Sequence, residues 1–250
     1  MEERRSETQK IHWVFVILML LAVAFGVTSV FLWKKVQRLE NVAGVQEVTD
    51  QKQASLGGDP FSEENLLFYA SQLGLDQDAF SSCLSDDSID QVLQNDKNDG
   101  IAAGVKGTPT FFVNGRPMYG AERWATMSDI IEQELGNKEI PSTVKRVNLS
   151  SEGVRIGNPQ AKVVVIEFSD FGCMYCAESY GIDTSSKTDA DKDRVIFQLR
   201  QLAEEGKILF VYRHFATLAP HAAKASVCAA KQDKFWPYHD LLFEVKWQKI

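Results

Sequence analysis

Residues 163–176 read VVVIEFSDFGCMYC, and this stretch is the main guide to the fold. Its mostly apolar first half predicts a buried strand, and the Ser-Asp-Phe-Gly segment that follows predicts a turn. Cys173 and Cys176 then stand, two residues apart, where the next helix is expected to begin. Unpaired N–H groups at a helix N-terminus favour the thiolate of the first cysteine. The second cysteine is close enough to form a disulfide with it, so the pattern predicts thiol–disulfide exchange.

Half of a zinc site and a structural disulfide are the alternatives for a cysteine pair at this spacing. Structural zinc normally takes four nitrogen or sulfur ligands at tight spacing. The other two cysteines, Cys83 and Cys228, stand alone, and the chain has no second CxxC and no paired-histidine motif. A CxxC that follows a strand in a strand–helix–strand setting is typical of redox chemistry. We therefore favour redox chemistry and expect no metal site.

The composition indicates a globular protein of one or two domains, with 250 residues, 44% hydrophobic and 24% charged. The formal net charge is −7, and Lys and Arg form no long block. Nucleic-acid binding is therefore not expected. Four cysteines are too few for disulfides to be the main scaffold.

Residues 13–33 read WVFVILMLLAVAFGVTSVFLW, 21 residues without a charge. At ~1.5 Å per residue, a helix of this length is about 31 Å long and matches a bilayer core. A signal peptide is the alternative, but its apolar region is usually about 7–15 residues long. We therefore predict a tail over residues 1–10, a retained single-span anchor over residues 11–33 and a polar tether over residues 34–60.

The flanking charges leave the orientation of this anchor open, because three basic residues precede the apolar stretch and three follow it closely. A dithiol that forms disulfides belongs in an oxidising compartment. We therefore expect a single-pass protein of the cell membrane with its catalytic domain outside the cytoplasm.

Helical patterns dominate the segment after the tether. Ser62 is a good N-cap for a helix that ends near Gly74. Further helices are predicted over residues 76–84 and 88–105. The apolar face of these two helices is expected to contain Phe80, Leu84, Ile89, Val92 and Leu93.

A strand pair and a helix are predicted next. Gly107-Thr108-Pro109 breaks the helical region, and residues 110–113 read as a strand that returns through residues 116–119. Asn114-Gly115 between them is a strong hairpin turn. Apolar residues then repeat at helical spacing over residues 122–135.

The last third of the chain predicts a strand–helix–strand unit. A polar connection comes first and contains a short strand over residues 145–149. A strand over residues 162–168 and the CxxC helix follow it. A polar stretch over residues 181–193 then leads to a helix over residues 195–205 and a strand over residues 207–213. Helices are expected over residues 220–231 and 235–246.

Five segments resemble the DsbA-like thiol–disulfide oxidoreductases. They are FSDFGCMYC (168–176), VYRHFATLAPHA (211–222), KFWPYHDLLFE (234–244), FSEENLLFYASQLGLD (61–76) and GVKGTPTFFVNGRP (104–117). The resemblance as a whole extends over most of residues 61–135 and 145–246, and these five segments are its most specific parts. The resemblance implies an α/β, thioredoxin-like fold with an inserted helical domain.

The order of these segments departs from the family, in which the CxxC half comes first. We therefore predict one circularly permuted domain over residues 61–250, preceded by the transmembrane helix. The helical insertion would comprise residues 61–106 and 214–250, and the thioredoxin core residues 107–136 and 145–213. The alternatives are halves of neighbouring copies in a tandem protein and halves that complete one another between two chains.

The resemblance also assigns roles to residues of the site. Cys173 is the nucleophile and Cys176 the resolving cysteine, while Met174-Tyr175 replaces the Pro-His or Pro-Phe pair that is common in the family. Pro109 matches the cis-proline that faces the CxxC. A cis X–Pro bond costs only about 0.5–1 kcal/mol. It would present the backbone of Thr108 to an extended substrate.

Glu167 matches a buried acid of the family, and we expect it to pass protons to or from Cys176. The alternative is a solvated glutamate on an edge strand. The resemblance further implies a non-catalytic disulfide between Cys83 and Cys228, with two buried free thiols as the alternative.

Together these expectations describe a membrane-anchored protein-disulfide oxidoreductase that forms disulfides in exported proteins and needs no cofactor. Its expected partners are unfolded or folding exported proteins and a membrane reoxidising protein of the DsbB or vitamin K epoxide reductase type. A disulfide reductase or isomerase, a metal-binding or delivery module that uses the CxxC, and an inactive fragment are the alternatives.

Overall fold

The computed structural model describes residues 58–182 and 194–247. The predicted tail and anchor, nearly all of the predicted tether and most of the polar stretch 181–193 lie outside the described residues. Within the described part, no helix is both long and apolar enough to cross a bilayer.

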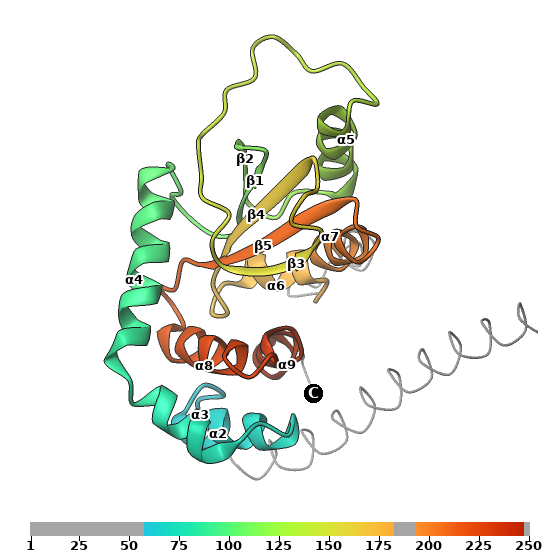
Figure 1. The fold of residues 1–250 in the computed structure, drawn as a ribbon. Helices are drawn as coiled ribbons and strands as arrows, with labels where there is room; N and C mark the ends of the chain where they lie inside the picture. The colour runs from blue at the N-terminus through green and yellow to red at the C-terminus, as the bar shows by residue number, and fades with distance from the viewer. Residues whose placement is uncertain (1–57, 183–193, 248–250) are drawn as a thin grey trace, which may run out of the picture. The chain divides into compact units, whose positions relative to one another are not determined.

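A five-stranded sheet forms the centre of the described structure, in the order β2-β1-β4-β5-β3 (Figure 1). The two central strands, β4 and β5, are parallel, and the other neighbouring pairs are antiparallel. The strands are β1 Thr110–Val113, β2 Arg116–Tyr119, β3 Val154–Gly157, β4 Val163–Ser169 and β5 Ile208–His214.

The two halves of the described chain meet within this sheet. β1 comes from the first half and β4 from the second, and they pair from Thr110 opposite Phe168 to Val113 opposite Val165. The described residues accordingly belong to one compact unit. The pairing places the segment before β1 beside the segment after β4.

The helices lie around the sheet, and Figure 1 shows α2, α3, α8 and α9 grouped at one end of it, with α4 running from that group past one side of the sheet. The helices are α2 Glu63–Gln72, α3 Gln77–Leu84, α4 Asp87–Ala102, α5 Trp124–Leu135, α6 Met174–Tyr180, α7 Val195–Glu204, α8 Pro220–Ala230 and α9 Phe235–Trp247.

Local signals explain where several helices begin and end. The Ser62 hydroxyl accepts a hydrogen bond from the backbone of Asn65 and so begins α2. Helix α4 ends before the predicted residue 105, because Gly104 adopts a φ of 91° and Val105 N–H bonds back to the Gly100 carbonyl. This is the usual way in which a glycine ends a helix.

The side chains of β4 alternate between two hydrophobic clusters, one on each face of the sheet. Val163 and Val165 face a cluster that includes α5 and α7, whereas Ile166 and Phe168 face a cluster on the opposite side. Successive side chains of a strand point to opposite faces, so both faces of β4 are buried. Polar residues occur only at the carboxyl end of this strand, at Glu167 and Ser169.

The predicted apolar face of the helices after the tether needs one correction. Phe80, Ile89 and Leu93 are buried as predicted, but Val92 is 44% exposed. The buried side of α4 follows Ile89 and Leu93 and continues to Asp96. Positions 89 and 93 are four residues apart and lie on the same face of the helix. Position 92 lies at the edge of that face, and its side chain is therefore partly exposed.

The predicted short strand over residues 145–149 is wrong, and the additional strand lies at β3 instead. Figure 1 shows residues 137–153 arching out from α5 before they return to the sheet. One backbone hydrogen bond, from Val147 N–H to the Gly115 carbonyl, ties this segment to the hairpin turn. A Cβ at Gly115 would lie 2.2 Å from the Val147 oxygen, so this approach requires glycine.

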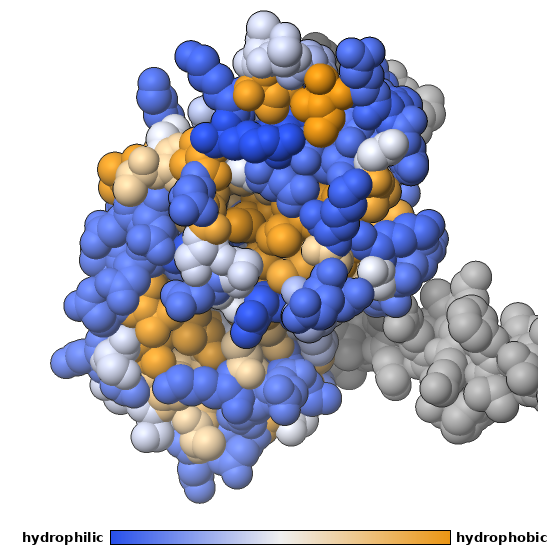
Figure 2. All heavy atoms as spheres, turned by 45° about the horizontal axis from the view of Figure 1, so that its top comes forward, coloured by the Kyte–Doolittle hydropathy of each residue, from blue (hydrophilic) through white to orange (hydrophobic). Residues whose placement is uncertain are grey.

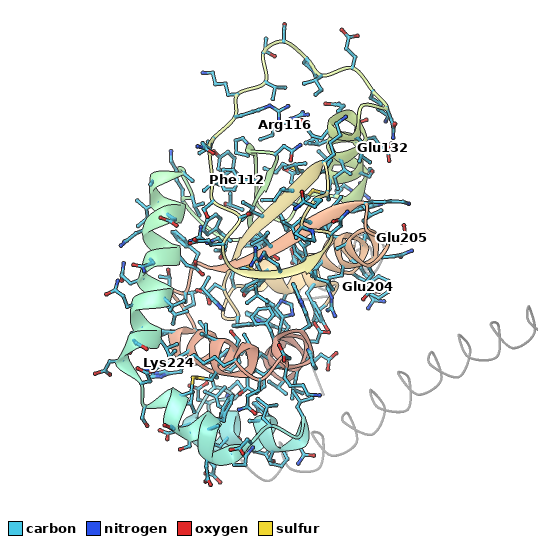
Figure 3. The ribbon with its side chains drawn as sticks, viewed as in Figure 1. Phe112, Arg116, Glu132, Glu204, Glu205 and Lys224 are labelled. Atoms are coloured by element: carbon cyan, nitrogen blue, oxygen red, sulfur yellow. A yellow bond between two sulfur atoms is a disulfide. The ribbon has the colours of Figure 1, made fainter. Side chains whose placement is uncertain are left out.

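Charged side chains hold the same segment in place. Glu134 of α5 accepts from Arg146 Nη2 at 2.8 Å and from Arg116 Nη1 at 3.1 Å. Figure 3 shows Arg116 at the hairpin, near α5. On the face seen in Figure 2, hydrophilic side chains surround several apolar patches.

A disulfide and an ion pair connect the helices at the end of the sheet. Cys83 of α3 is bonded to Cys228 of α8, the pairing that the family resemblance implies. Lys224 of α8 (labelled in Figure 3) lies 2.7 Å from the Asp90 carboxylate of α4.

Candidate functional site

Cys173 occupies the position just before the first residue of α6. Its backbone is extended, with φ −94° and ψ 120°, and it accepts hydrogen bonds from the N–H groups of Cys176 and Ala177. The strand, turn and helix therefore follow one another as the sequence predicts. Both Cys173 and Cys176 are buried free thiols.

The segment Gly107-Thr108-Pro109 lies directly against this cysteine. The Thr108–Pro109 peptide bond is cis. The Cys173 Sγ is 3.2 Å from the Thr108 carbonyl oxygen and is placed to donate to it. Two segments that are 65 residues apart in the chain thus meet at one sulfur atom.

A pocket of about 490 Å³ opens on the Thr108 side of the site. It is lined by residues 106–110 together with Tyr119 and Gly120. Two of the lining residues are connected directly, because the Gly120 N–H donates to the Pro109 carbonyl at 2.8 Å. The pocket therefore follows the backbone that carries the cis-proline.

Apolar side chains are exposed at three positions around the cysteine pair. Met174 and Tyr175 are 39% and 53% exposed, and Leu218 is 66% exposed. Leu218 is close to the active-site turn, since a Cβ at Gly172 would lie 2.6 Å from the Leu218 Cβ. Exposed apolar groups at a site are typical of protein-binding surfaces.

The electrostatics around Cys173 favour its thiolate. The pKa of its thiol is lowered to about 6, chiefly by hydrogen bonding with the Cys176 thiol. Contact with Thr108 and the backbone N–H groups of Cys176 and Tyr175 lower the pKa further, while burial opposes them. A thiolate near neutral pH is the form that attacks disulfides.

Cys176 is affected in the opposite direction. Burial raises the pKa of its thiol well above the ordinary value, and the Cys173 and Glu167 charges raise it further. The two thiols therefore differ in their preferred protonation state. One is suited to attack and the other to hold a proton.

Glu167 is 1% exposed on the central strand β4, so the alternative of a solvated glutamate on an edge strand is wrong. Burial raises the pKa of its carboxyl group to about 8. A buried acid with a pKa near neutrality can both give and take a proton under physiological conditions. Its charge reaches the Cys176 thiol and raises the pKa of that group.

Asp170 organises the turn that precedes the cysteines. Its carboxylate accepts from Gly172 N–H at 2.9 Å and from Thr217 and Leu218 N–H at 2.7 Å each. A third segment of the chain is thereby tied to the active-site turn. The role of Asp170 is therefore structural.

Three polar neighbours of Glu167 were missed by sequence analysis. Ser169, Tyr212 and His214 are buried at the carboxyl ends of β4 and β5. Nothing in the sequence alone shows that Tyr212 lies opposite Glu167, because this depends on the register of the two strands. The one available signal is the presence of polar residues at the ends of two otherwise apolar strands.

In the described part of the chain, no group of three or more His, Cys, Asp or Glu side chains is arranged to hold a metal ion. The arrangement that is present is a pair of thiols, a buried acid and a cis-proline. This combination is suited to the exchange of a disulfide for a dithiol.

Comparisons with known proteins find a DSBA-like thioredoxin domain over residues 24–132 and a thioredoxin domain over residues 149–249. The first match contains the cis-proline segment, and the second contains the cysteine pair and Glu167. The chain is thus similar to DsbA-like thioredoxin domains in its first half and to thioredoxin domains in its second half. The fold is thioredoxin-like α/β, and the similarity supports thiol–disulfide oxidoreductase activity in general.

The chain is also similar to part of two curated Na(+)/H(+) antiporters. The chain is 33% identical over 82 residues to a Na(+)/H(+) antiporter NhaA of Herminiimonas arsenicoxydans. It is 31% identical over 91 residues to a Na(+)/H(+) antiporter NhaA 3 of Salinispora tropica. These matches cover 32% and 34% of this chain but only 13% and 12% of the antiporters. The chain therefore spans about an eighth of the length of these relatives.

Proposed function

We propose that this protein is a membrane-anchored, extracytoplasmic oxidoreductase that forms disulfides in exported proteins through Cys173 and Cys176. The observation that carries the proposal is the 3.2 Å contact between Cys173 Sγ and the Thr108 carbonyl beside the cis-proline. This contact joins the reactive sulfur to a backbone segment that can bind an extended polypeptide.

The reaction begins with the oxidised protein, in which Cys173 and Cys176 are joined. A substrate thiolate attacks Cys173 Sγ, a substrate–Cys173 bond forms, and the Cys173–Cys176 bond breaks with Cys176 leaving as a thiolate. Because burial strongly disfavours the Cys176 thiolate, Glu167 gives it a proton.

A second substrate thiolate then attacks the substrate sulfur of the mixed disulfide. A substrate disulfide forms, and Cys173 leaves as a thiolate that its surroundings stabilise. The substrate loses two electrons and the cysteine pair gains them. A membrane partner of the DsbB or vitamin K epoxide reductase type would remove these electrons and restore the disulfide.

The substrate is expected to bind next to Cys173. The pocket along residues 106–110 would hold an extended backbone, while the apolar rim at Met174, Tyr175 and Leu218 would contact side chains of an unfolded chain. Both features suit a substrate without a fixed structure, and neither selects a particular side chain.

The central experiment follows a reduced peptide with two cysteines that is mixed with the oxidised full chain. We expect one peptide disulfide and one reduced Cys173–Cys176 pair for each turnover in the absence of another oxidant. Cys173→Ala should abolish the transfer, whereas a paired Cys83→Ala and Cys228→Ala variant should retain it. Wild-type protein that is oxidised but leaves the peptide reduced would contradict the proposal.

Titration against a glutathione redox buffer separates an oxidase from a reductase or isomerase with the same site. An oxidase should have its cysteine pair largely reduced in a buffer that keeps structural disulfides intact. A pair that stays oxidised there indicates a reductase or isomerase.

We also propose that the domain is a circular permutant of the family arrangement. The pairing of β1 with β4 within one chain supports this proposal. The location outside the cytoplasm is supported by the apolar stretch 13–33 and by the chemistry of the site. A maleimide that cannot cross membranes should label Cys173 in intact cells and not only after lysis.

A further inference from the structure

Four buried polar side chains gather beside Cys176 at the ends of the two central strands. The parallel register places Glu167 opposite Tyr212 and Ser169 opposite His214. Residues two apart on a strand share a face, so all four belong to one face of the sheet. Each of these residues is at most 3% exposed.

Each of the four side chains has an unpartnered polar atom. Glu167 Oε2, Ser169 Oγ, Tyr212 OH and His214 Nδ1 complete no hydrogen bond with any residue in the described ranges. Buried polar atoms without partners are rare, because they lose their hydration without compensation. Four of them at facing positions of two adjacent strands indicate a shared role.

The donors and acceptors in this cluster are complementary. The Ser226 hydroxyl donates to the Ala223 carbonyl at 2.8 Å, so His214 Nε2 carries the proton of their 3.4 Å contact. His214 Nδ1 is then an acceptor. The hydroxyl groups of Ser169 and Tyr212 are donors, and the Glu167 carboxyl group can be either.

Ser169 is a neighbour of both groups that exchange a proton. Its hydroxyl completes no hydrogen bond in this geometry, but it is near enough to the Glu167 carboxyl, the Cys176 thiol and the Tyr212 hydroxyl to lower the pKa of each. On the other side of Glu167, β1 offers only Phe111. The titratable groups that surround the cluster are Cys173, Cys176, Asp170 and His239.

We propose that Ser169 and Tyr212 are positioning residues for the proton that moves between Glu167 and Cys176. The Ser169 hydroxyl bridges the carboxyl group and the thiol, and the Tyr212 hydroxyl donates to the carboxylate that remains after the transfer. This inference rests on the proposed function and adds two residues to its mechanism.

The step is balanced without a further reactant. As the Cys173–Cys176 bond breaks, the Cys176 thiolate accepts the Glu167 proton, and the negative charge moves to Glu167. The Tyr212 hydroxyl and the Ser169 hydroxyl keep their own protons and reorient toward that charge. When the disulfide forms again, the proton returns to Glu167.

The test uses two substitutions that remove only a hydroxyl group, Ser169→Ala and Tyr212→Phe. Tyr238→Phe is the matched control, because Tyr238 is also fully buried but its hydroxyl donates to Leu66 O, far along the chain from the cluster. The full chain is labelled with ¹³C at its glutamate carboxyl groups, and Glu167→Gln assigns the Glu167 signal. Reduction of the oxidised protein by dithiothreitol is then followed against pH.

We expect Tyr212→Phe and Ser169→Ala to raise the pKa of the Glu167 carboxyl above about 8. Each should slow the reduction near neutral pH about tenfold, a part of the ~10²–10⁴-fold contribution that a positioned acid makes. The inflection of the rate profile should move to higher pH. Tyr238→Phe should leave both the carboxyl titration and the profile unchanged.

Wild-type titration and rate profiles in both hydroxyl variants would overturn the inference. An equal loss of rate in all three variants, with no shift of the profile, would also overturn it and indicate a packing effect. If the proposed function itself is wrong, a different result is expected. The wild-type disulfide would then not exchange with any dithiol, although the titration of the Glu167 carboxyl could still be measured.

Discussion

Burial and hydrogen bonding determine which of the individual residues at this site are protonated. Cys173 is held toward its thiolate, whereas Cys176 and Glu167 are held toward their protonated forms. The apolar surroundings that penalise charge at Glu167 are the same ones that keep Cys176 neutral. Each protonation state therefore depends on a neighbour and can be tested by changing that neighbour.

Replacing Cys176 tests the origin of the reactive thiolate. Cys176→Ala removes the hydrogen bond that contributes most to lowering the Cys173 pKa, whereas Cys176→Ser keeps a donor there. We expect the Cys173 pKa to rise above about 6 in the alanine variant and to stay closer to it in the serine variant. The pH dependence of the iodoacetamide alkylation rate measures this. Equal pKa values in the two variants would contradict it.

Glu167→Gln should change how stability depends on pH. The folded pKa of Glu167 is raised to about 8 from 4.5, so the folded state binds more protons between these values and stability falls as pH rises through them. His214, whose pKa is lowered to about 3 from 6.5, acts in the opposite direction below pH 6.5. Glu244, whose pKa is raised to about 7, adds to the decline below pH 7, so the interval from about pH 7 to 8 is diagnostic for Glu167.

Urea unfolding of the oxidised protein, in which neither active-site thiol titrates, measures this effect. Between pH 4.5 and 8 the raised pKa of Glu167 corresponds to an effect on the order of 5 kcal/mol, at about 1.4 kcal/mol for each pKa unit. We expect the free energy of unfolding to decline between pH 7 and 8 in the wild type and to decline much less in Glu167→Gln. A parallel decline in both proteins would exclude Glu167 as its source.

At the scale of elements, helix α4 is joined to strand β5 by charges rather than by apolar packing alone. Asp96 of α4 accepts from Arg213 Nε at 2.8 Å and from the His214 N–H at 2.9 Å. Asp99 also contacts Arg213, at 2.7 Å, but its side chain is half exposed. The same strand end that supplies Tyr212 and His214 to the site is thus fixed by α4.

Asp96→Ala should be much more harmful than Asp99→Ala. Removing the buried partner leaves the Arg213 charge without its main compensation, which typically costs about 3–5 kcal/mol. The exposed partner should be worth about 0–1 kcal/mol. Chemical denaturation of both variants tests this order. Equal losses would show that the buried pair does not secure α4.

Elements were predicted well where a local signal defines them. Ser62 begins α2, Asn114-Gly115 forms the hairpin turn with φ values of 47° and 80°, and the CxxC follows its strand and turn. Val92 and the expected strand 145–149 were wrong because burial and pairing depend on distant partners. Tyr212 could not be assigned for the same reason, since only the register of β5 with β4 brings it to Glu167.

For the whole molecule, the essential feature is that one chain supplies both sides of the site. The cis-proline precedes the cysteine pair in sequence, and β1 and β4 bring them together within one compact unit. An exchange of halves between two chains would build the same contacts from different molecules. The two arrangements differ in whether a defect in one half can be rescued by another chain.

Mixing two inactive variants distinguishes these arrangements. Cys173→Ala removes the nucleophile, and Pro109→Ala is expected to disturb the Thr108 carbonyl position on the other side of the site. If each chain builds its own site, every molecule in a co-refolded mixture retains one defect, and disulfide transfer stays at the level of the two variants alone. Exchange between chains would instead create wild-type sites in mixed dimers. In that case up to about half of the sites in each mixed dimer would be wild type, disulfide transfer would recover in proportion, and the protein would have the mass of a dimer in solution. This result would contradict a site that each chain builds alone.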